Sequence, residues 1–155
     1  MCQFAFIRKE YFEVHDSFVE MMDPNNRVKQ TERQYLFVKV KYKDNNILVP
    51  LRKELPNLKA KMCFKAPCQS KPNAGLDYRK IMIVNDMTDI ELVPEQKLPD
   101  AQYNKIVDNY DKIEKAVISY IEGYIRSAKK NRHLIDYEYK YSTLHNYHNE
   151  LHITE

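Results

Sequence analysis

The chain has 155 residues, of which 43% are hydrophobic and 30% charged, so it is long enough to bury one core and does not have a disordered composition. It contains only two glycines, which excludes a Walker A loop and a Rossmann fingerprint because both need several glycines at fixed spacing. The formal net charge of +3 is mildly basic and does not by itself indicate nucleic-acid binding.

The first third of the chain predicts a strand, a helix and a hairpin. Residues 3–8 form a short strand with apolar side chains on both faces, and apolar positions at helical spacing predict a helix over 9–22. Residues 23–26 end that helix, and 27–33 read as a polar loop. The segment RQYLFVKVKYKDNNILVPLRKE, 33–54, predicts two strands joined by a turn at KDNN, with Pro50 at an edge position or strand end.

The remainder predicts short strands and one long helix. Residues 60–66 favour a strand, 67–79 an irregular basic loop, and 80–85 and 89–94 two further strands. Apolar positions three and four apart predict a helix from about 100 to about 134. Alternation over 136–142 predicts a short strand, and 143–151 one or two helical turns. The expected fold class is α+β, in a single domain spanning 1–155.

The cysteines and the absence of long apolar runs bear on location. Cys2, Cys63 and Cys68 are too few and too scattered for a disulfide framework, and no second cysteine pair completes a zinc site. No apolar run reaches the roughly 18 residues of a membrane span, and the N-terminus lacks a signal-peptide pattern. We therefore expect free thiols in a reducing cytoplasm.

Three histidines recur near the C-terminus at i, i+3 and i+7, namely His145, His148 and His152. A shared helical face would be the geometry of a metal site, but no carboxylate or cysteine is arranged to complete the coordination. We interpret them as an exposed face and expect no metal.

Two features favour RNA as a ligand. Twelve tyrosines occur, and the segments QYLFVKVKYK and DYEYKY interleave aromatic with cationic residues, a pattern that suits stacking on unpaired bases and contact with phosphates. Core and edge packing in a chain without tryptophan explains most of these tyrosines.

The hairpin would bring Arg33, Arg52 and Lys53 together at one end. Cleavage of RNA by its own 2′-OH needs a proton acceptor, a proton donor and positive charge on the phosphorane-like transition state, without a metal. A lysine whose pKa is lowered by neighbouring cations can act as the base. The alternative interpretation is three solvated charges at strand ends.

Several segments, taken in order, resemble the ribonuclease toxins of type III toxin–antitoxin systems, the ToxN, AbiQ and CptN-like proteins. FAFIRKEYFEVHDSFVEMM is similar to the family's opening strand and S-x-x-Y-x-x-x-L helix, and 33–54 to its hairpin ending in (A/V)-P-L. RKIMIVN is similar to its F-M-I-P strand, and YKYSTLHNY to its closing (D/N)-F-x-x-L element.

The resemblance implies a compact, strongly curved antiparallel sheet with helices, related to the MazF and Kid-like toxins. It implies a metal-independent endoribonuclease that leaves a 2′,3′-cyclic phosphate and a 5′-OH, without cofactors. It also implies inhibition by a repeated pseudoknotted RNA, which the toxin processes and binds in a ring-like assembly.

The resemblance places Arg33 at the family's basic position before the first hairpin strand, and Arg52 and Lys53 where the family has Ser or Thr followed by Ser. The family's P-L-(S/T)-S-P-K reads PLRKELPNLK here, so the hydroxyls are replaced and either Lys53 or Lys59 answers the family's lysine. Thr31 and Ser70 are candidates to restore a hydroxyl from neighbouring loops.

These observations lead to one principal hypothesis, a sequence-selective endoribonuclease toxin with Arg33, Arg52 and Lys53 as catalytic residues. The predicted RNA-binding side chains are Lys29, Tyr35, Lys39, Lys41, Lys43, Lys59, Lys129, Lys130 and Arg132. A non-catalytic RNA-binding module and a protein-binding partner are the alternatives.

Overall fold

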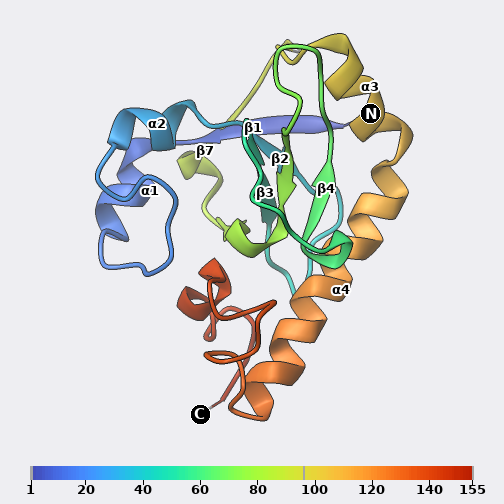
Figure 1. Ribbon diagram of the computed structural model, residues 1–155. Helices are drawn as coiled ribbons and strands as arrows, with labels where there is room; N and C mark the ends of the chain where they lie inside the picture. The colour runs from blue at the N-terminus through green and yellow to red at the C-terminus, as the bar shows by residue number, and fades with distance from the viewer. Residues whose placement is uncertain (1, 96, 155) are drawn as a thin grey trace.

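A seven-stranded antiparallel sheet flanked by helices forms the centre of the molecule in the computed structural model, which describes residues 2–95 and 97–154 (Figure 1). The strand order is β4-β5-β3-β2-β1-β7, and β6 pairs with β3. The strands are β1 Gln3–Ile7, β2 Tyr35–Phe37, β3 Ile47–Arg52, β4 Cys63–Lys65, β5 Gly75–Asp77, β6 Met82–Ile83 and β7 Ile90–Leu92. The expected α+β class is confirmed. None of the described helices is long and apolar enough to cross a membrane.

The predicted hairpin is confirmed as the β2/β3 pair, although its first strand ends at Phe37. The strand ends early because the backbone N–H of Lys39 leaves the ladder and donates to the Tyr110 hydroxyl at 2.7 Å. The turn falls at the predicted position, where Lys43 and Asp44 adopt φ of 50° and 66°, the left-handed conformation that tight hairpin turns require.

Pro50 lies inside the sheet, so its predicted place at an edge or strand end is wrong. The N–H of Leu51 donates to the Gln34 carbonyl on the β2 side at 3.0 Å, and backbone groups alternate in direction along a strand, so the Pro50 nitrogen faces the other side. There it lies between Leu48, paired with β6, and Leu51, paired with β5. Strands β5 and β6 leave Pro50 unpaired on that side, so its missing N–H costs no hydrogen bond of the sheet.

Helix α1, Lys9–Val14, is shorter than the predicted 9–22 helix. The chain leaves the helix after Val14 because its next residues pack on the C-terminal segment. The Phe18 ring packs edge-on against the Tyr147 ring with centroids 5.4 Å apart, and the Val19 backbone exchanges hydrogen bonds of 2.9 and 2.8 Å with the Asn146 side chain.

Helix α2, Arg27–Glu32, occupies the segment predicted as a polar loop. The side chain of Asn26 caps it by accepting a hydrogen bond from the Lys29 N–H at 3.1 Å, which satisfies one of the unpaired donors at a helix start. This corrects the loop prediction and places Lys29 within a helix and Arg33 directly after its end.

The predicted long helix is two helices, α3 Asp100–Asp108 and α4 Tyr110–Lys129. Asn109, with φ −115° and ψ 15°, interrupts the helical backbone. The second helix ends before the predicted 134 because Asn131 adopts φ 57° and the Arg132 N–H returns to the Ser127 carbonyl at 2.9 Å, a common helix-ending arrangement.

The segment after α4 forms turns, so the predicted strand over 136–142 is wrong. Asp136 holds the segment by accepting hydrogen bonds from the Ser127 hydroxyl at 2.7 Å and from Arg132 at 3.1 Å. Tyr139 packs directly on Gly123, where a Cβ atom would collide with the Tyr139 hydroxyl. The short helix η4, Thr143–Asn146, confirms one of the helical turns predicted for 143–151. Strand β5, in contrast, lies inside the predicted loop 67–79.

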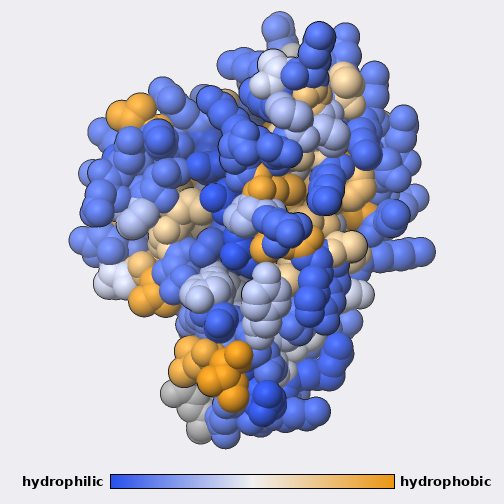
Figure 2. All heavy atoms as spheres, viewed as in Figure 1, coloured by the Kyte–Doolittle hydropathy of each residue, from blue (hydrophilic) through white to orange (hydrophobic). Residues whose placement is uncertain are grey.

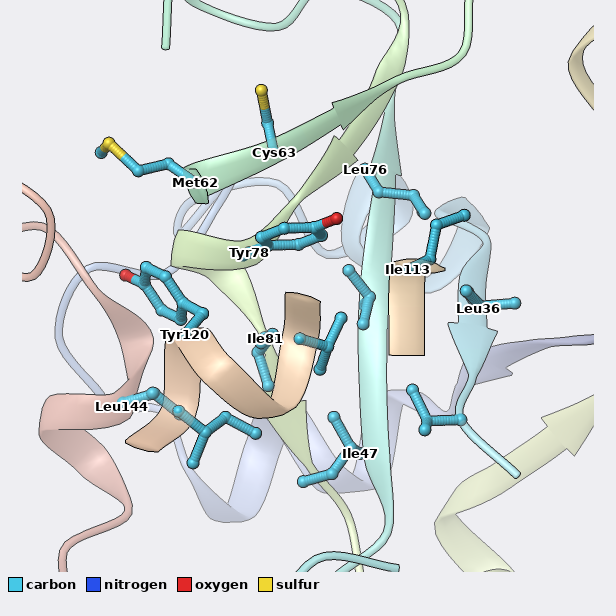
Figure 3. Packing of buried hydrophobic residues seen from close by; sticks show 14 of the residues in the cluster. Leu36, Ile47, Met62, Cys63, Leu76, Tyr78, Ile81, Ile113, Tyr120 and Leu144 are labelled. Atoms are coloured by element: carbon cyan, nitrogen blue, oxygen red, sulfur yellow. The ribbon is translucent and has the colours of Figure 1, made fainter. Parts of the chain in front are cut away.

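Both faces of the sheet are covered by apolar side chains. One cluster lies between the sheet and α4, where Ile113 and Tyr120 pack against Leu36, Ile47 and Tyr78 (Figure 3). The other cluster packs α1 against the opposite face. The two-sided burial predicted for the first strand is confirmed, because Phe4 belongs to one cluster and Ala5 and Ile7 to the other.

The face of the molecule drawn in Figure 2 is mainly polar. Figure 2 shows hydrophilic side chains over most of one face, with small apolar areas between them. Leu134 and Ile135, in the segment after α4, are among the exposed apolar residues. The cavity described below is lined largely by charged groups and therefore differs from these areas in chemistry.

Candidate active site

A cavity of about 380 Å³ lies where α2, the Arg33 end of the hairpin, the loop between β4 and β5, and the start of α3 come together. Five cations line it: Lys29, Arg33, Arg52, Lys53 and Lys71. The lining carboxylates are Asp23, Glu32 and Glu54. The structure thus brings together all three residues predicted to be catalytic, with Lys29 from the predicted RNA-binding set.

The hairpin register explains why Arg33 and Arg52 meet. Tyr35 pairs with Pro50 in the β2/β3 ladder, and the chains run antiparallel, so the residues two positions further out lie opposite each other. The hydrogen bond from Leu51 to Gln34 continues this register by one residue. Lys53 follows directly and is exposed.

Arg33 is held in place by two contacts. Its Nη2 forms an ion pair with Asp23 Oδ2 at 2.6 Å, and its Nη1 donates to the Leu51 carbonyl at 3.2 Å. Both partners lie in the cavity wall, and the side chains of Arg33 and Asp23 are 18% and 25% exposed. An anion that enters the cavity therefore meets an arginine that is already paired with a partly accessible carboxylate.

Arg52 is held by a carboxylate that is fully buried. Asp77 Oδ2 accepts hydrogen bonds from Arg52 Nη1 and Arg79 Nη2, both at 2.9 Å, and Oδ1 accepts from the Arg79 Nε at 3.1 Å. Burial lowers the pKa of Arg79, but the hydrogen bonds and charge of Asp77 outweigh it and raise that pKa above its ordinary value. The two guanidiniums share one carboxylate, which leaves this group of charges with a net positive charge behind the cavity.

Lys71 was not among the predicted site residues. It enters the cavity because the loop between β4 and β5 turns back on itself, with paired backbone hydrogen bonds of 3.1 and 3.0 Å between Cys68 and Lys71. The sequence marked this loop only as basic and irregular, and its long-range position depends on strand β5, which periodicity did not detect.

No hydroxyl group is found among the described residues that line the cavity. Thr31 donates to the Val28 carbonyl at 3.1 Å and lines a different hollow, with Arg8 and Arg27. Ser70 contacts the Cys68 sulfur at 3.6 Å. Neither side chain restores the hydroxyl that the resemblance led us to expect, so cations and carboxylates are the groups available for proton transfer.

Tyr35 is only 3% exposed and lies in the core, which removes it from the surface where a base would stack. Its ring packs in the cluster beneath α1, because alternation along β2 turns it to that face. The predicted role of Tyr35 in stacking is therefore corrected.

The other predicted RNA-binding cations do not line the cavity. Lys39 lies over the Tyr110 ring at 4.5 Å, and Lys43 donates to the Leu151 carbonyl at 3.4 Å, so the distal end of the hairpin faces α4 and the C-terminal segment. Lys59 lies over the Tyr137 ring at 5.3 Å. The remaining four are exposed at the hairpin end or at the end of α4: Lys41, Lys129, Lys130 and Arg132.

A second unpredicted charge, Lys80, lies just beyond the Asp77 group. Its Nζ donates to the carbonyls of Glu20 and Tyr141, both at 2.8 Å, and its side chain is 11% exposed. Burial and the nearby Arg79 charge lower the pKa of Lys80 to about 8. Lys80 therefore links the loop that follows α1 to the C-terminal segment.

The C-terminal histidines do not form the single exposed face that was expected. His145 and His148 are half-buried and both contact the Tyr124 hydroxyl, at 2.7 and 2.6 Å. His152 adopts φ 57° and is exposed. The turns of this segment break the helical spacing on which that interpretation depended.

Comparison with known proteins gives a match at the level of fold. No protein-family model and no curated protein matches the chain. One solved structure concerns bacterial type III toxin–antitoxin systems in which a non-coding RNA pseudoknot selectively inhibits the toxin; it has 18% identity, covers 77% of each chain and gives a TM-score of 0.63. A second concerns a bacterial antiviral system regulated by a processed non-coding RNA; it has 18% identity, covers 84% of this chain and 88% of the other, and gives a TM-score of 0.62. The fold predicted from the resemblance is confirmed.

Proposed function

We propose that the protein is a metal-independent, sequence-selective endoribonuclease toxin of a type III toxin–antitoxin system, acting on cellular RNA in the cytoplasm. The observation that carries this proposal is the cavity in which Arg33, Arg52 and Lys53 meet two further lysines. The shared fold supports it, because one solved neighbour belongs to a type III system and the other to an antiviral system regulated by RNA.

In the proposed reaction the 2′-oxygen of a ribose attacks the adjacent phosphorus and the bond from phosphorus to the 5′-oxygen breaks. The products are a 2′,3′-cyclic phosphate and a 5′-OH. Arg33 and Arg52 bind the scissile phosphate and stabilise the charge that develops on its oxygens. Lys53 either accepts the 2′-proton itself, or remains charged and stabilises the transition state while a carboxylate of the cavity wall accepts that proton. Lys71 gives a proton to the leaving 5′-oxygen.

The inhibitor in this proposal is a repeated pseudoknot RNA, which the protein cuts from a precursor and then binds in a ring-like assembly. Such an RNA would occupy the same cavity as a substrate, because the phosphates of both need the same cations. The exposed Lys41, Lys129 and Lys130 lie outside the cavity and are available to contact RNA further along its backbone.

A non-catalytic RNA-binding module is the second candidate function. Two observations favour it: Arg33 and Arg52 both form ion pairs with carboxylates, and no hydroxyl lines the described cavity. In that case the same cations would hold the backbone without assisting proton transfer.

The decisive experiment incubates the purified protein with mixed cellular RNA in the presence of EDTA and maps the chemistry of new ends. We expect cyclic-phosphate and 5′-OH ends at a repeated short sequence, lost in Lys53→Ala and retained in Lys112→Ala, an exposed lysine on α4 away from the cavity. Intact RNA that stays bound to the wild-type protein would establish the binding module instead. Intact RNA with no binding would refute both functions.

Binding to a non-cleavable single strand tests the cavity separately from the chemistry. Each phosphate contact adds roughly 0.7 to the slope of log affinity against log salt, so Lys53→Ala should lower that slope by about 0.7 while Lys112→Ala leaves it unchanged. An unchanged slope for Lys53→Ala would place the RNA elsewhere on the surface.

A further inference from the structure

Three histidines and a tyrosine gather between the end of α4 and the segment that follows it. The nitrogen atoms that His133, His145 and His148 turn toward one another all lie within 4.8 Å of one another. The Tyr124 hydroxyl lies between two of these rings, 2.7 Å from His145 Nδ1 and 2.6 Å from His148 Nε2. Among the described residues no other group of three such ligands has this arrangement.

The hydrogen bonds fix the tautomer of His145 in the form that a metal ligand needs. Its Nε2 lies 3.1 Å from the Lys140 carbonyl, which can only accept, so the proton of neutral His145 is on Nε2. Nδ1 then carries a lone pair directed at Tyr124. A backbone carbonyl that orients the far nitrogen of a histidine is the usual outer contact of a metal-ligating imidazole.

The donors and acceptors in the two hydrogen bonds of the Tyr124 hydroxyl can be assigned in the same way. Tyr124 has one hydroxyl proton and two ring nitrogens within hydrogen-bond distance. It donates that proton to His145 Nδ1, and His148 Nε2–H donates to the Tyr124 oxygen. Binding of a cation among these atoms would therefore displace the protons that now lie between them, as metal binding to protein ligands generally does.

His133 gives an independent indication that the group is built for a ligand. Its Nδ1 is buried and has no hydrogen-bond partner, an unfavourable state for a polar atom. The His133 ring lies with its centroid 5.5 Å from that of His145 and 5.1 Å from that of His148. A ligand among the rings would bring a partner within reach of this side chain.

We propose that His133, His145 and His148 bind a zinc-class divalent transition-metal ion, with the Tyr124 oxygen as the fourth donor. Three imidazoles and one oxygen suit zinc, which is bound by four ligands in a tetrahedral arrangement. Nitrogens at 2.0–2.1 Å from zinc lie roughly 3.3 Å apart in such a site, so the rings close in around the ion by rotating about their side-chain bonds.

The metal would have a structural role that does not depend on the proposed ribonuclease function. The segment after Lys129 contains no strand and only the four-residue helix η4 among its described residues, and the site ties three points of that segment to α4. In Figure 1 the start of α3, which borders the cavity, lies at the top of the molecule and the end of α4 at the bottom, so the ion would be remote from the cavity.

The test uses tag-free, full-length protein that has been treated with a chelator and dialysed into a buffer that does not bind metal. Isothermal titration calorimetry with zinc chloride should give a stoichiometry of one ion per chain. A thermal scan of the zinc-loaded protein should give a higher Tm than that of the metal-free protein. His133→Ala should weaken binding at least 100-fold, because one of four ligands is lost. His152→Ala is the matched control, since it removes an exposed histidine of the same segment and should leave affinity unchanged.

The choice of His133→Ala and one further variant, Tyr124→Phe, keep the proposal falsifiable. His133→Ala removes no hydrogen bond of that side chain's buried Nδ1, so it should fold even if the changes at His145 or His148 do not. Tyr124→Phe should weaken zinc binding about 10-fold. In protein loaded with Co²⁺ in place of zinc, the same variant should change the visible absorption of the bound ion. An absence of stoichiometric binding to the wild-type protein, or binding that His133→Ala leaves intact, would overturn the proposal.

Discussion

The substitution Asp77→Asn tests whether the buried carboxylate behind the cavity holds the structure together. Asp77 is fully buried and accepts hydrogen bonds from Arg52 and from both the side chain and the backbone N–H of Arg79. Asparagine has nearly the same shape, but it is neutral and turns an NH₂ donor toward at least one guanidinium. Two arginines then share a site without a compensating charge.

Removing one partner of a buried charge pair costs about 3–5 kcal/mol. Asparagine retains one acceptor oxygen, so we expect a loss of about 3 kcal/mol in the free energy of unfolding. For a domain of this size the corresponding fall in Tm is about 6–12 °C. Urea unfolding at neutral pH measures the free energy, and a thermal scan measures Tm.

The control is Asp108→Asn, which removes an exposed carboxylate at the end of α3 and should change the free energy of unfolding by a few tenths of a kcal/mol at most. A loss below about 1 kcal/mol for Asp77→Asn would refute the reasoning, because it would mean that Arg52 and Arg79 find equivalent partners without the carboxylate.

Three further predictions concern backbone approach, a shifted pKa and competition for an arginine. Gly75→Ala should lower the free energy of unfolding by about 1–3 kcal/mol in urea unfolding, because the new Cβ collides with the Phe64 carbonyl oxygen across the β4/β5 pair. Lys80→Met should abolish a rise in stability with pH. The pKa of Lys80 is about 8 in the folded protein against roughly 10.4 in the unfolded chain, so between these values the unfolded chain binds more protons and stability increases with pH. In urea unfolding, the wild-type free energy of unfolding should rise relative to that of the variant by about 2 kcal/mol between pH 7 and 9.5. Asp23→Asn should strengthen binding of non-cleavable RNA several-fold in a filter or anisotropy assay, because it releases Arg33 from a partly exposed carboxylate.

For each of these three predictions, one experimental outcome would contradict the reasoning. A Gly75→Ala variant as stable as wild type would mean that the two strands separate at little cost. A constant stability difference between wild type and Lys80→Met across that pH range would place the lysine pKa at its ordinary value in the folded protein. Unchanged or weaker RNA binding by Asp23→Asn would mean that Arg33 needs its carboxylate to point into the cavity.

The catalytic candidates could be predicted because they depend on short-range pattern. Alternation in 33–54 predicts an antiparallel hairpin, and its register alone brings Arg33 opposite Arg52. The same reasoning failed for the lysines of the first hairpin strand. Lys39 leaves the ladder for a hydrogen bond with Tyr110, which lies 71 residues further along the chain, and no local pattern carries that information.

The parts that sequence missed depend on contacts between distant segments. Lys71 enters the cavity through β5, a strand of three residues that is too short to show alternation. Asp77 and Arg79 fall inside the predicted loop 67–79, and the ion pair between Asp77 and Arg52 follows from the β3/β5 ladder. The histidine cluster depends on turns after α4 that replace the helix on which the spacing argument rested.

The two predicted arginines are held by different kinds of carboxylate, and this difference bears on how the cavity would bind a phosphate. Asp77 is fully buried and does not line the cavity, so it fixes Arg52 from behind without competing for a ligand. Asp23 lines the cavity and is 25% exposed, so a phosphate that approaches Arg33 must replace or share that carboxylate. Arg52 is therefore the pre-oriented anion-binding group and Arg33 the adjustable one. Because no hydroxyl is found among the described residues that line the cavity, the proposed reaction would depend on its cations and carboxylates for proton transfer.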